Sequence, residues 1–103
     1  MKEYALLYTR EAKKKIEKLD PSIKKIIKKA IESLKTNPLK GKALSYELAG
    51  LRSLRASDYR IIYRVKEKQL IIIVISVGYR REVYKRLKEL ITKKINELEN
   101  EKS

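Results

Sequence analysis

The sequence predicts a single α+β domain, with a small antiparallel sheet backed by a helical hairpin and followed by a C-terminal helix. Its 103 residues suffice for one domain but are too few for a barrel enzyme or a doubly wound dinucleotide-binding fold. Two segments with helical periodicity come early in the chain, and three strand-like segments joined by short connections follow them. We therefore expect residues 1–103 to form one domain with the element order β-α-α-β-β-β-α.

The first part of the chain predicts one strand and two helices. Residues 4–8 alternate as a strand, and Thr9 is suited to cap the helix that follows. Asp20 and Pro21 are the residue types of an N-cap and a first helical position, and Asn37-Pro38 ends the second helix. The apolar positions expected to face the core are Ala12, Ile16 and Leu19 in the first helix, and Ile23, Ile26, Ile27, Ala30, Ile31 and Leu34 in the second.

Three strands are predicted next, over residues 51–56, 59–66 and 69–77. The two-residue connections Ser57-Asp58 and Glu67-Lys68 suit tight antiparallel turns. These three strands are therefore expected to form a meander.

The third of these strands and the segment after it indicate how the sheet is covered. Residues 70–75 are all apolar, so we expect a central strand that is covered on both faces. Gly78 is expected to end this strand, and a final helix is expected from about Glu82. This helix would cover the second face through Val83, Leu87, Leu90, Ile91 and Leu98.

A register follows from the Ser57-Asp58 turn, and it places Arg55 opposite Arg60 on one face of the sheet. Two facing arginines are normally destabilising, and an anion between them makes the arrangement more tolerable. Two other interpretations stay open: both guanidinium groups extend into water, or Glu47 or Glu82 neutralises them. The opposite face is expected to be core, with both of its tyrosines as packing residues; it carries Leu54, Ala56, Tyr59, Ile61, Tyr63 and Val65.

The chain is strongly basic, and its arginines and lysines are segregated. It has 27 Lys+Arg against 13 Asp+Glu, a formal net charge of +14, which favours a polyanionic partner. Seven of the eight arginines lie between Arg52 and Arg86, whereas lysines dominate the predicted helices. Because Arg grips phosphate through a planar fork, we expect functional residues among the arginines. The Lys- and Ile-rich composition itself resembles that of a thermophile.

Missing residue types exclude several kinds of site. Without His or Cys the chain has no Ser-His-Asp triad, no thiol nucleophile, no zinc-finger site and no disulfide. The longest apolar stretch is far shorter than the roughly 20 residues of a membrane span. The N-terminal segment also lacks the pattern of a signal peptide. We therefore expect a soluble, cytoplasmic protein with no membrane partner.

Arginines and tyrosines are sufficient for one kind of nuclease, because RNA supplies its own nucleophile, the 2′-hydroxyl. Arginines can hold the scissile phosphate and stabilise the added negative charge. A tyrosine among arginines can act as a base, because nearby positive charge favours the phenolate. Arg80 and Arg81 emerge after Gly78, and Arg81 is better interpreted as a solvated residue at the N-terminus of the helix. Tyr84, one turn into the helix, is either a core residue or a site residue.

Several motifs between residues 50 and 84 resemble the RelE toxin family, within the wider RelE/ParE superfamily of toxin–antitoxin systems. The hairpin carries R-x-x-x-Y-R-hydrophobic-hydrophobic-Y, the next strand ends in V-G-x-R, and E-V-Y follows. The β-α-α order before these motifs fits as well. The resemblance implies a RelE-like fold over nearly the whole chain.

The resemblance also implies an activity, partners and site residues. RelE proteins cleave mRNA in the ribosomal A site by 2′-hydroxyl attack, without a metal or a small-molecule cofactor. Each is held inactive by an antitoxin that wraps it, and for this chain we expect an acidic antitoxin. Arg60 resembles the arginine that helps to hold the phosphate and to stabilise the transition state. Arg80 resembles the arginine that stabilises the transition state or protonates the leaving group, and Tyr84 resembles the tyrosine that orients or deprotonates the 2′-hydroxyl. Further RNA- or phosphate-binding residues are then expected at Arg52, Arg55, Arg64 and Arg81.

The chain departs from the bacterial RelE pattern just before Arg55. Leu51 and Ser53 stand where that pattern has lysines, and Ala49 stands where it has an arginine. The identity of the general base therefore stays open. Two alternatives to a nuclease also stay open: a ParE-type toxin, which shares the scaffold and inhibits DNA gyrase, and a basic RNA-binding module without activity.

Overall fold

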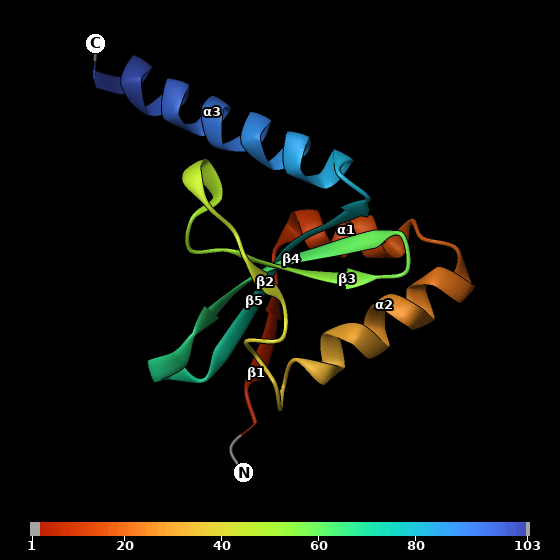
Figure 1. Cartoon of the computed structure of the whole chain (residues 1–103). Coiled ribbons are helices and arrows are strands. Elements are labelled where there is room, and N and C mark those ends of the chain that lie inside the picture. The colour runs from red at the N-terminus through yellow and green to blue at the C-terminus, as the bar shows by residue number, and fades with distance from the viewer. Residues whose placement is uncertain (1–2, 103) are drawn as a thin grey trace.

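The chain forms a five-stranded sheet of order β1-β5-β4-β3-β2 (Figure 1). The computed structural model describes residues 3–102, with side chains described for residues 3–92. The predicted α+β class and the predicted order of helices and long strands are confirmed. The strands are β1 (Ala5–Tyr8), β2 (Lys42–Ala43), β3 (Arg52–Ala56), β4 (Tyr59–Lys66) and β5 (Ile71–Tyr79), and the helices are α1 (Arg10–Glu17), α2 (Pro21–Ser33) and α3 (Glu82–Lys102).

Two features of the sheet differ from the sequence-based expectation. β1 pairs parallel with β5, from Ala5 against Ile71 to Tyr8 against Val74, so the sheet is mixed and not wholly antiparallel. β2 was not expected, because two residues are too short to show an alternating pattern; it pairs antiparallel with β3. The pairing of β1 with β5 joins segments far apart in the sequence, and no local signal specifies it.

The two N-terminal helices begin where predicted. Thr9 caps α1: its hydroxyl accepts the Ala12 N–H at 3.1 Å and donates to the Ile75 carbonyl at 2.6 Å, which ties the helix to β5. Asp20 occupies the N-cap position of α2, but its side chain makes no capping hydrogen bond. The expectation that Ile26 faces the core is wrong. It is 43% exposed, because the buried positions of α2 run along the neighbouring stripe that contains Ile27.

The first hairpin has the predicted register, whereas the second connection and the end of β5 were predicted wrongly. Arg55 faces Arg60, as the Ser57-Asp58 turn requires. The connection after β4 is a 3₁₀ turn at Glu67–Gln69, followed by Leu70 in a left-handed conformation (φ 55), so it is longer than two residues. β5 continues through Gly78 to Tyr79 instead of ending at the glycine.

Gly78 is required by a close approach of α3 to the sheet. A Cβ at Gly78 would lie 2.7 Å from the Cβ of Val83, well inside van der Waals contact. Only a residue without a side chain therefore lets the first turn of α3 settle onto β5 at this point.

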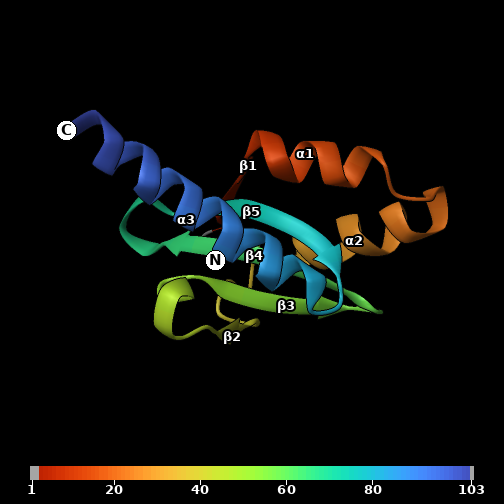
Figure 2. The same cartoon turned by 90° about the horizontal axis from the view of Figure 1, so that it is seen from above.

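The helices α1 and α2 lie on one side of the sheet and α3 on the other (Figure 2), and a hydrophobic core lies on each side. The expectation that α3 covers the second face is therefore confirmed. A bulge at Ile75 in β5 shifts the alternation of side chains, because Ile62 pairs with Ser76 and Tyr63 with Val74. The core under α1 and α2 contains Ala12, Ile16, Ile27, Ile31, Leu34, Leu54, Ala56, Ile61, Tyr63, Ile72, Val74 and Val77. The smaller core under α3 contains Leu48, Ile62, Val83 and Leu87.

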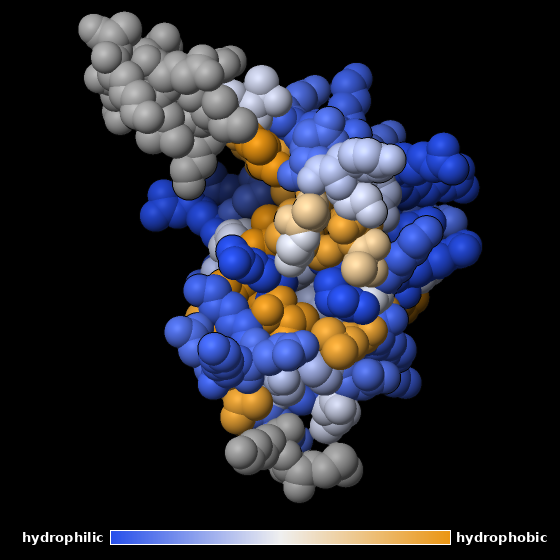
Figure 3. Space-filling model, turned by 60° about the vertical axis from the view of Figure 1, so that its left-hand side comes forward, coloured by the Kyte–Doolittle hydropathy of each residue, from blue (hydrophilic) through white to orange (hydrophobic). Residues whose placement is uncertain are grey.

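The helix α3 is 21 residues long, and among its described side chains Val83, Tyr84, Leu87 and Ile91 pack in the core under it. Leu90 and Ile91 are half-buried, whereas Leu98 lies outside the residues whose side chains are described. Apolar surface is visible beside α3 among hydrophilic side chains (Figure 3). Within residues 3–102, neither α3 nor another helix combines the length and the apolar character that crossing a membrane requires.

Tyr63 connects β4 to the segment before β2, and its side chain is fully buried. Its hydroxyl donates to the Pro38 carbonyl and accepts the Gly41 N–H, both at 2.8 Å. Tyr63→Phe leaves both partners without this hydroxyl, so we expect it to lower the free energy of unfolding by about 1–3 kcal/mol, measured by urea denaturation. Tyr79→Phe is the control, because Tyr79 is 39% exposed and water can reach its hydroxyl. Equal losses in the two variants would contradict the prediction.

Arg55 and Arg60 repel each other across β3 and β4. We expect Arg55→Gln to raise the free energy of unfolding at low salt by about 0.2–1 kcal/mol relative to Arg64→Gln. The two substitutions are matched, but Arg64 faces Ile73 and not a cation. Urea denaturation at low and high salt measures the difference, which should shrink as salt screens the pair. A difference that is absent at low salt would show that the two guanidinium groups do not repel.

Candidate functional site

A cleft of about 520 Å³ opens on the side of the sheet that α3 covers. β3, the start of α3 and the 3₁₀ turn at Tyr46–Leu48 contribute to its walls. It brings together three residues that the sequence singled out, Arg55, Arg60 and Tyr84. The full lining is Lys42, Leu44, Ser45, Tyr46, Glu47, Leu48, Ser53, Arg55, Arg60, Tyr84 and Lys88.

The sheet register positions the polar groups of the cleft in two rows. In the first row Arg55 faces Arg60, which in turn faces Gly78 in β5. In the second row Lys42 of β2 faces Ser53 of β3. Because paired residues in neighbouring strands point to the same face, the side chains of Lys42 and Ser53 leave the sheet next to each other.

Tyr84 is both a packing residue and a cleft residue, which answers the question that the sequence left open. Its ring packs against the small core under α3. Its hydroxyl lies 2.7 Å from the hydroxyl of Ser53, and either can be the donor. Ser53 is only 8% exposed, so this hydrogen bond fixes the Tyr84 hydroxyl at the wall of the cleft.

Arg80 lies at the corner between β5 and α3 and is not among the residues that line the cleft. Its backbone N–H donates to the Asp58 carbonyl at 2.7 Å, and its guanidinium lies 3.8 Å from the Asp58 carboxylate and 5.1 Å from the centre of the Tyr79 ring. Its φ of 48° is a left-handed conformation that is strained for a residue with a side chain. The Arg80 side chain remains 63% exposed.

The three remaining arginines of the sequence-based prediction also lie outside the lining of the cleft. Arg52 holds the segment before β2: its guanidinium donates to the Gly41 carbonyl at 3.0 Å and to the Leu39 carbonyl at 3.2 Å. Arg64 is exposed on β4, and Arg81 is exposed just before α3. The cleft thus receives its arginines from β3 and β4.

Among the lining residues that the sequence-based prediction missed are two lysines and an exposed tyrosine: Lys42, Lys88 and Tyr46. Lys88 had a usable signal, because it is four residues after Tyr84 and so lies on the same side of a helix. Lys42 depends on the pairing of β2, which has no recognisable pattern. The position of Tyr46 depends on a 3₁₀ turn for which the sequence has no recognisable pattern.

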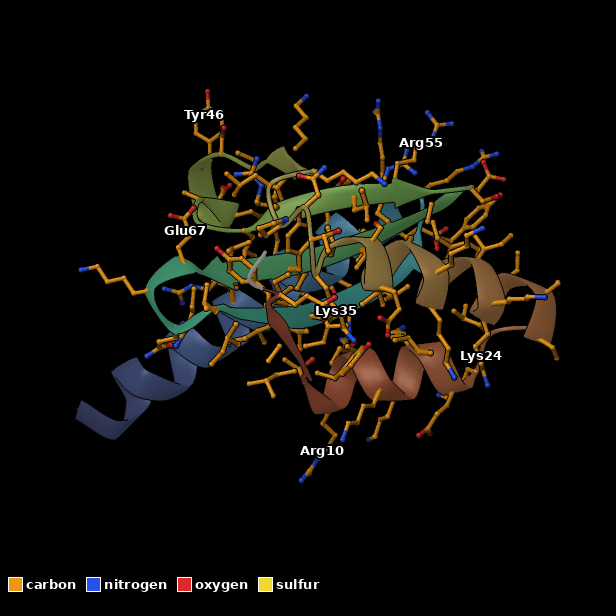
Figure 4. All side chains as sticks on the ribbon, turned by 90° about the horizontal axis from the view of Figure 1, so that it is seen from below. Arg10, Lys24, Lys35, Tyr46, Arg55 and Glu67 are labelled. Atoms are coloured by element: carbon orange, nitrogen blue, oxygen red, sulfur yellow. The ribbon has the colours of Figure 1, made fainter. Side chains whose placement is uncertain are left out.

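The cleft has a strong positive charge. Four of its lining residues are basic and only Glu47 is acidic. Within residues 3–92, neither Arg55 nor Arg60 makes an ion pair with a carboxylate, so the interpretation that Glu47 or Glu82 neutralises them is not supported. Arg55 projects outward on the same side as Tyr46 (Figure 4).

This arrangement suits an anionic ligand that also carries hydroxyl groups. The arginines can donate charge-assisted hydrogen bonds to a phosphate, and the paired hydroxyls of Ser53 and Tyr84 can exchange hydrogen bonds with a sugar hydroxyl. Among the described residues, no group of three Asp or Glu side chains is close enough to hold a metal ion, and the chain has no His or Cys.

Comparison with known proteins gives consistent results. The family model for the ParE toxin of the type II toxin–antitoxin system parDE matches residues 6–84. The toxin RelG of Mycobacterium tuberculosis is 33% identical over 85 residues, which cover 81% of this chain and 98% of RelG. The mRNA interferase toxin RelE of Escherichia coli is 34% identical over 89 residues, which cover 79% of this chain and 90% of RelE.

Solved structures agree with these relatives. A chain in the crystal structure of the toxin–antitoxin complex RelBE2 from Mycobacterium tuberculosis superposes with a TM-score of 0.73 at 32% identity. The match covers 78% of this chain and 94% of that one. With the arginine-lined cleft on the shared fold, the chain belongs to the RelE/ParE superfamily of toxins from type II toxin–antitoxin systems.

Proposed function

We propose that this protein is a ribosome-dependent endoribonuclease that cleaves mRNA in the ribosomal A site and so inhibits translation. The observation that carries the proposal is the convergence of Arg55, Arg60 and Tyr84 on one cleft. These residues come from β3, β4 and α3, and only the fold brings them together. The mRNA interferase activity in the name of the Escherichia coli relative supports the same assignment.

In the proposed reaction the 2′-oxygen of the RNA forms a bond to the adjacent phosphorus, and the bond from phosphorus to the 5′-oxygen of the next nucleotide breaks. Arg60 and Arg55 hold the phosphate and stabilise the charge that develops on it. Tyr84 orients the 2′-hydroxyl or takes its proton, and the leaving 5′-oxygen takes a proton from water. The product is a 2′,3′-cyclic phosphate, and no metal or small-molecule cofactor takes part.

Arg80 would contribute from the corner beside the cleft. The only ion pair that it makes within residues 3–92 is the 3.8 Å contact with Asp58, and the side chain is largely exposed. It can therefore turn toward a bound phosphate and stabilise the negative charge on the leaving group.

The proposed dependence on the ribosome is supported by the open cleft and the small number of catalytic groups in it. A site that relies on arginines and one tyrosine needs its substrate in a near-attack geometry, which the decoding site would impose on the mRNA. The net charge of +14 would draw the protein to ribosomal RNA. The proposed partners are thus the ribosome, mRNA and an acidic antitoxin in the cytoplasm.

A second candidate is a toxin that inhibits a topoisomerase without cleaving RNA. The observation that favours it is the matching family model, which is that of the ParE toxin over residues 6–84. In that case the cleft residues would have no catalytic role. A plain RNA-binding module is a third candidate, supported only by the charge.

Substitutions at the cleft test the proposal through cleavage of mRNA on purified ribosomes, mapped by primer extension. We expect Arg60→Ala to lower the rate roughly 100- to 1,000-fold, because it removes charge stabilisation from the transition state. Tyr84→Phe should lower the cleavage rate about 100-fold or more, because the hydroxyl that orients or deprotonates the 2′-hydroxyl is lost. We also expect Arg80→Ala to relieve growth arrest. Lys25→Gln, on the exposed side of α2, is the control and should cleave like the parent protein.

The outcomes separate the candidates. Unchanged cleavage in the Arg60 and Tyr84 variants would refute the assignment of these residues. Growth arrest with stalled replication and intact mRNA would identify the topoisomerase inhibitor. Affinity for free RNA with a salt slope of about −0.7 per phosphate contact, and no cleavage on ribosomes, would identify the RNA-binding module.

A further inference from the structure

Tyr46 is presented to solvent by a turn that is itself firmly anchored. The side chain is 90% exposed, which is unusual for an aromatic ring, and it belongs to neither hydrophobic core. The turn beneath it is held by hydrogen bonds from Leu48 N–H to the Ser45 carbonyl at 3.1 Å and from Ala49 N–H to the Tyr46 carbonyl at 3.0 Å. Leu48 is only 5% exposed and fixes the turn to the core under α3.

The backbone of Tyr46 is strained. Its φ is 56°, a left-handed conformation that favours Gly or Asn and disfavours a residue with a bulky side chain. Glycine or asparagine at this position would fold more easily, so the aromatic ring is not there for the stability of the turn. Strain of this kind gathers at ligand-binding sites, where it points a side chain at the ligand.

Tyr46 is among the residues that line the same cleft as the facing arginines Arg55 and Arg60. Figure 4 shows Tyr46 and Arg55 projecting on the same side of the molecule, from the turn and from β3. Cationic groups for the phosphates together with an aromatic face for the base are the combination by which proteins bind single-stranded RNA. Tyr84 cannot supply that face, because its ring packs against the core and its hydroxyl is bonded to Ser53.

We propose that Tyr46 stacks on the nucleobase of a nucleotide next to the phosphate held by Arg55 and Arg60. This inference rests on the proposed function, since it describes how the same cleft would bind its RNA. Tyr46 is then a substrate-positioning residue, whereas the arginines and Tyr84 act on the reacting atoms. Every base has a π-face, so stacking alone tolerates different sequences.

Cleavage on ribosomes with four variants provides the first test. We expect Tyr46→Ala and Tyr46→Leu to lower kcat/KM roughly 10- to 100-fold, the loss typical of one removed base stack. Tyr46→Phe and Tyr46→Trp should stay close to the parent protein, because each keeps an aromatic face. Leu is the informative comparison, because it is apolar and large but cannot stack. Leu39→Ala removes another side chain that is half exposed and outside the cleft, and it should have no effect.

A fluorescence experiment tests the stack without cleavage. A short single-stranded RNA with 2′-O-methyl groups cannot be cleaved, and a 2-aminopurine base in it is quenched when an aromatic ring stacks on it. We expect quenching on binding to the parent protein, to Tyr46→Phe and to Tyr46→Trp. We expect none with Tyr46→Ala or Tyr46→Leu. The thermal midpoint of Tyr46→Ala should not fall, since the ring contacts no core; a fall would indicate a structural role instead.

The two experiments fail independently. If the parent protein does not cleave on ribosomes but quenches 2-aminopurine through Tyr46, the proposed nuclease function is wrong and the stacking proposal stands. If the parent protein cleaves, and Tyr46→Ala matches it in kcat/KM and in quenching, the stacking proposal is overturned and the nuclease function stands.

Discussion

The Ser57-Asp58 turn joins β3 to β4 through two residues, and its register holds Arg55 opposite Arg60. Side chains alternate between the faces of a strand, so a shift of one residue would turn the arginines into the core and the core residues into the cleft. Both residues of the turn have a defined role: Ser57 takes a left-handed φ of 57°, and the Asp58 carbonyl accepts the Arg80 N–H at 2.7 Å. The same two residues thus fix the hairpin and the end of β5.

The approach of α3 to the sheet depends on this register. Gly78 faces Arg60 across β4 and β5, and the absence of a side chain there lets Val83 settle directly above the strand. Tyr84 is the next residue of the helix, so the same contact brings its hydroxyl to 2.7 Å from Ser53. A bulkier residue at position 78 would lift the helix and separate the two hydroxyls. One glycine therefore couples the packing of α3 to the geometry of the cleft.

Local signals were enough to predict the helices, the first hairpin and the facing arginines, because each depends on residues close together in the sequence. The parallel pairing of β1 with β5 could not be predicted, because segments more than 60 residues apart meet there and only the assembled core selects that edge. Lys42 and Tyr46 were not predicted as cleft residues, because a two-residue strand positions Lys42 and a strained turn positions Tyr46. Gly78 was correctly marked as special but for the wrong reason: a close approach, and not a strand end, requires it.

The charge of the cleft has opposite consequences for the free and the bound protein. Lys42, Arg55, Arg60 and Lys88 line one space together, so in the free protein they repel one another and reduce the stability of the fold. A bound anion attracts each of these cations and offsets their mutual repulsion, so a ligand that binds only the folded protein raises its stability. Because the donors are already in place, little reorganisation is needed when negative charge develops. An RNA backbone and an acidic protein segment would satisfy the same cations, so the two ligands would compete for the cleft. Under the proposed function, that competition gives a physical route to inhibition, since an acidic antitoxin segment over these side chains would both stabilise the toxin and exclude RNA.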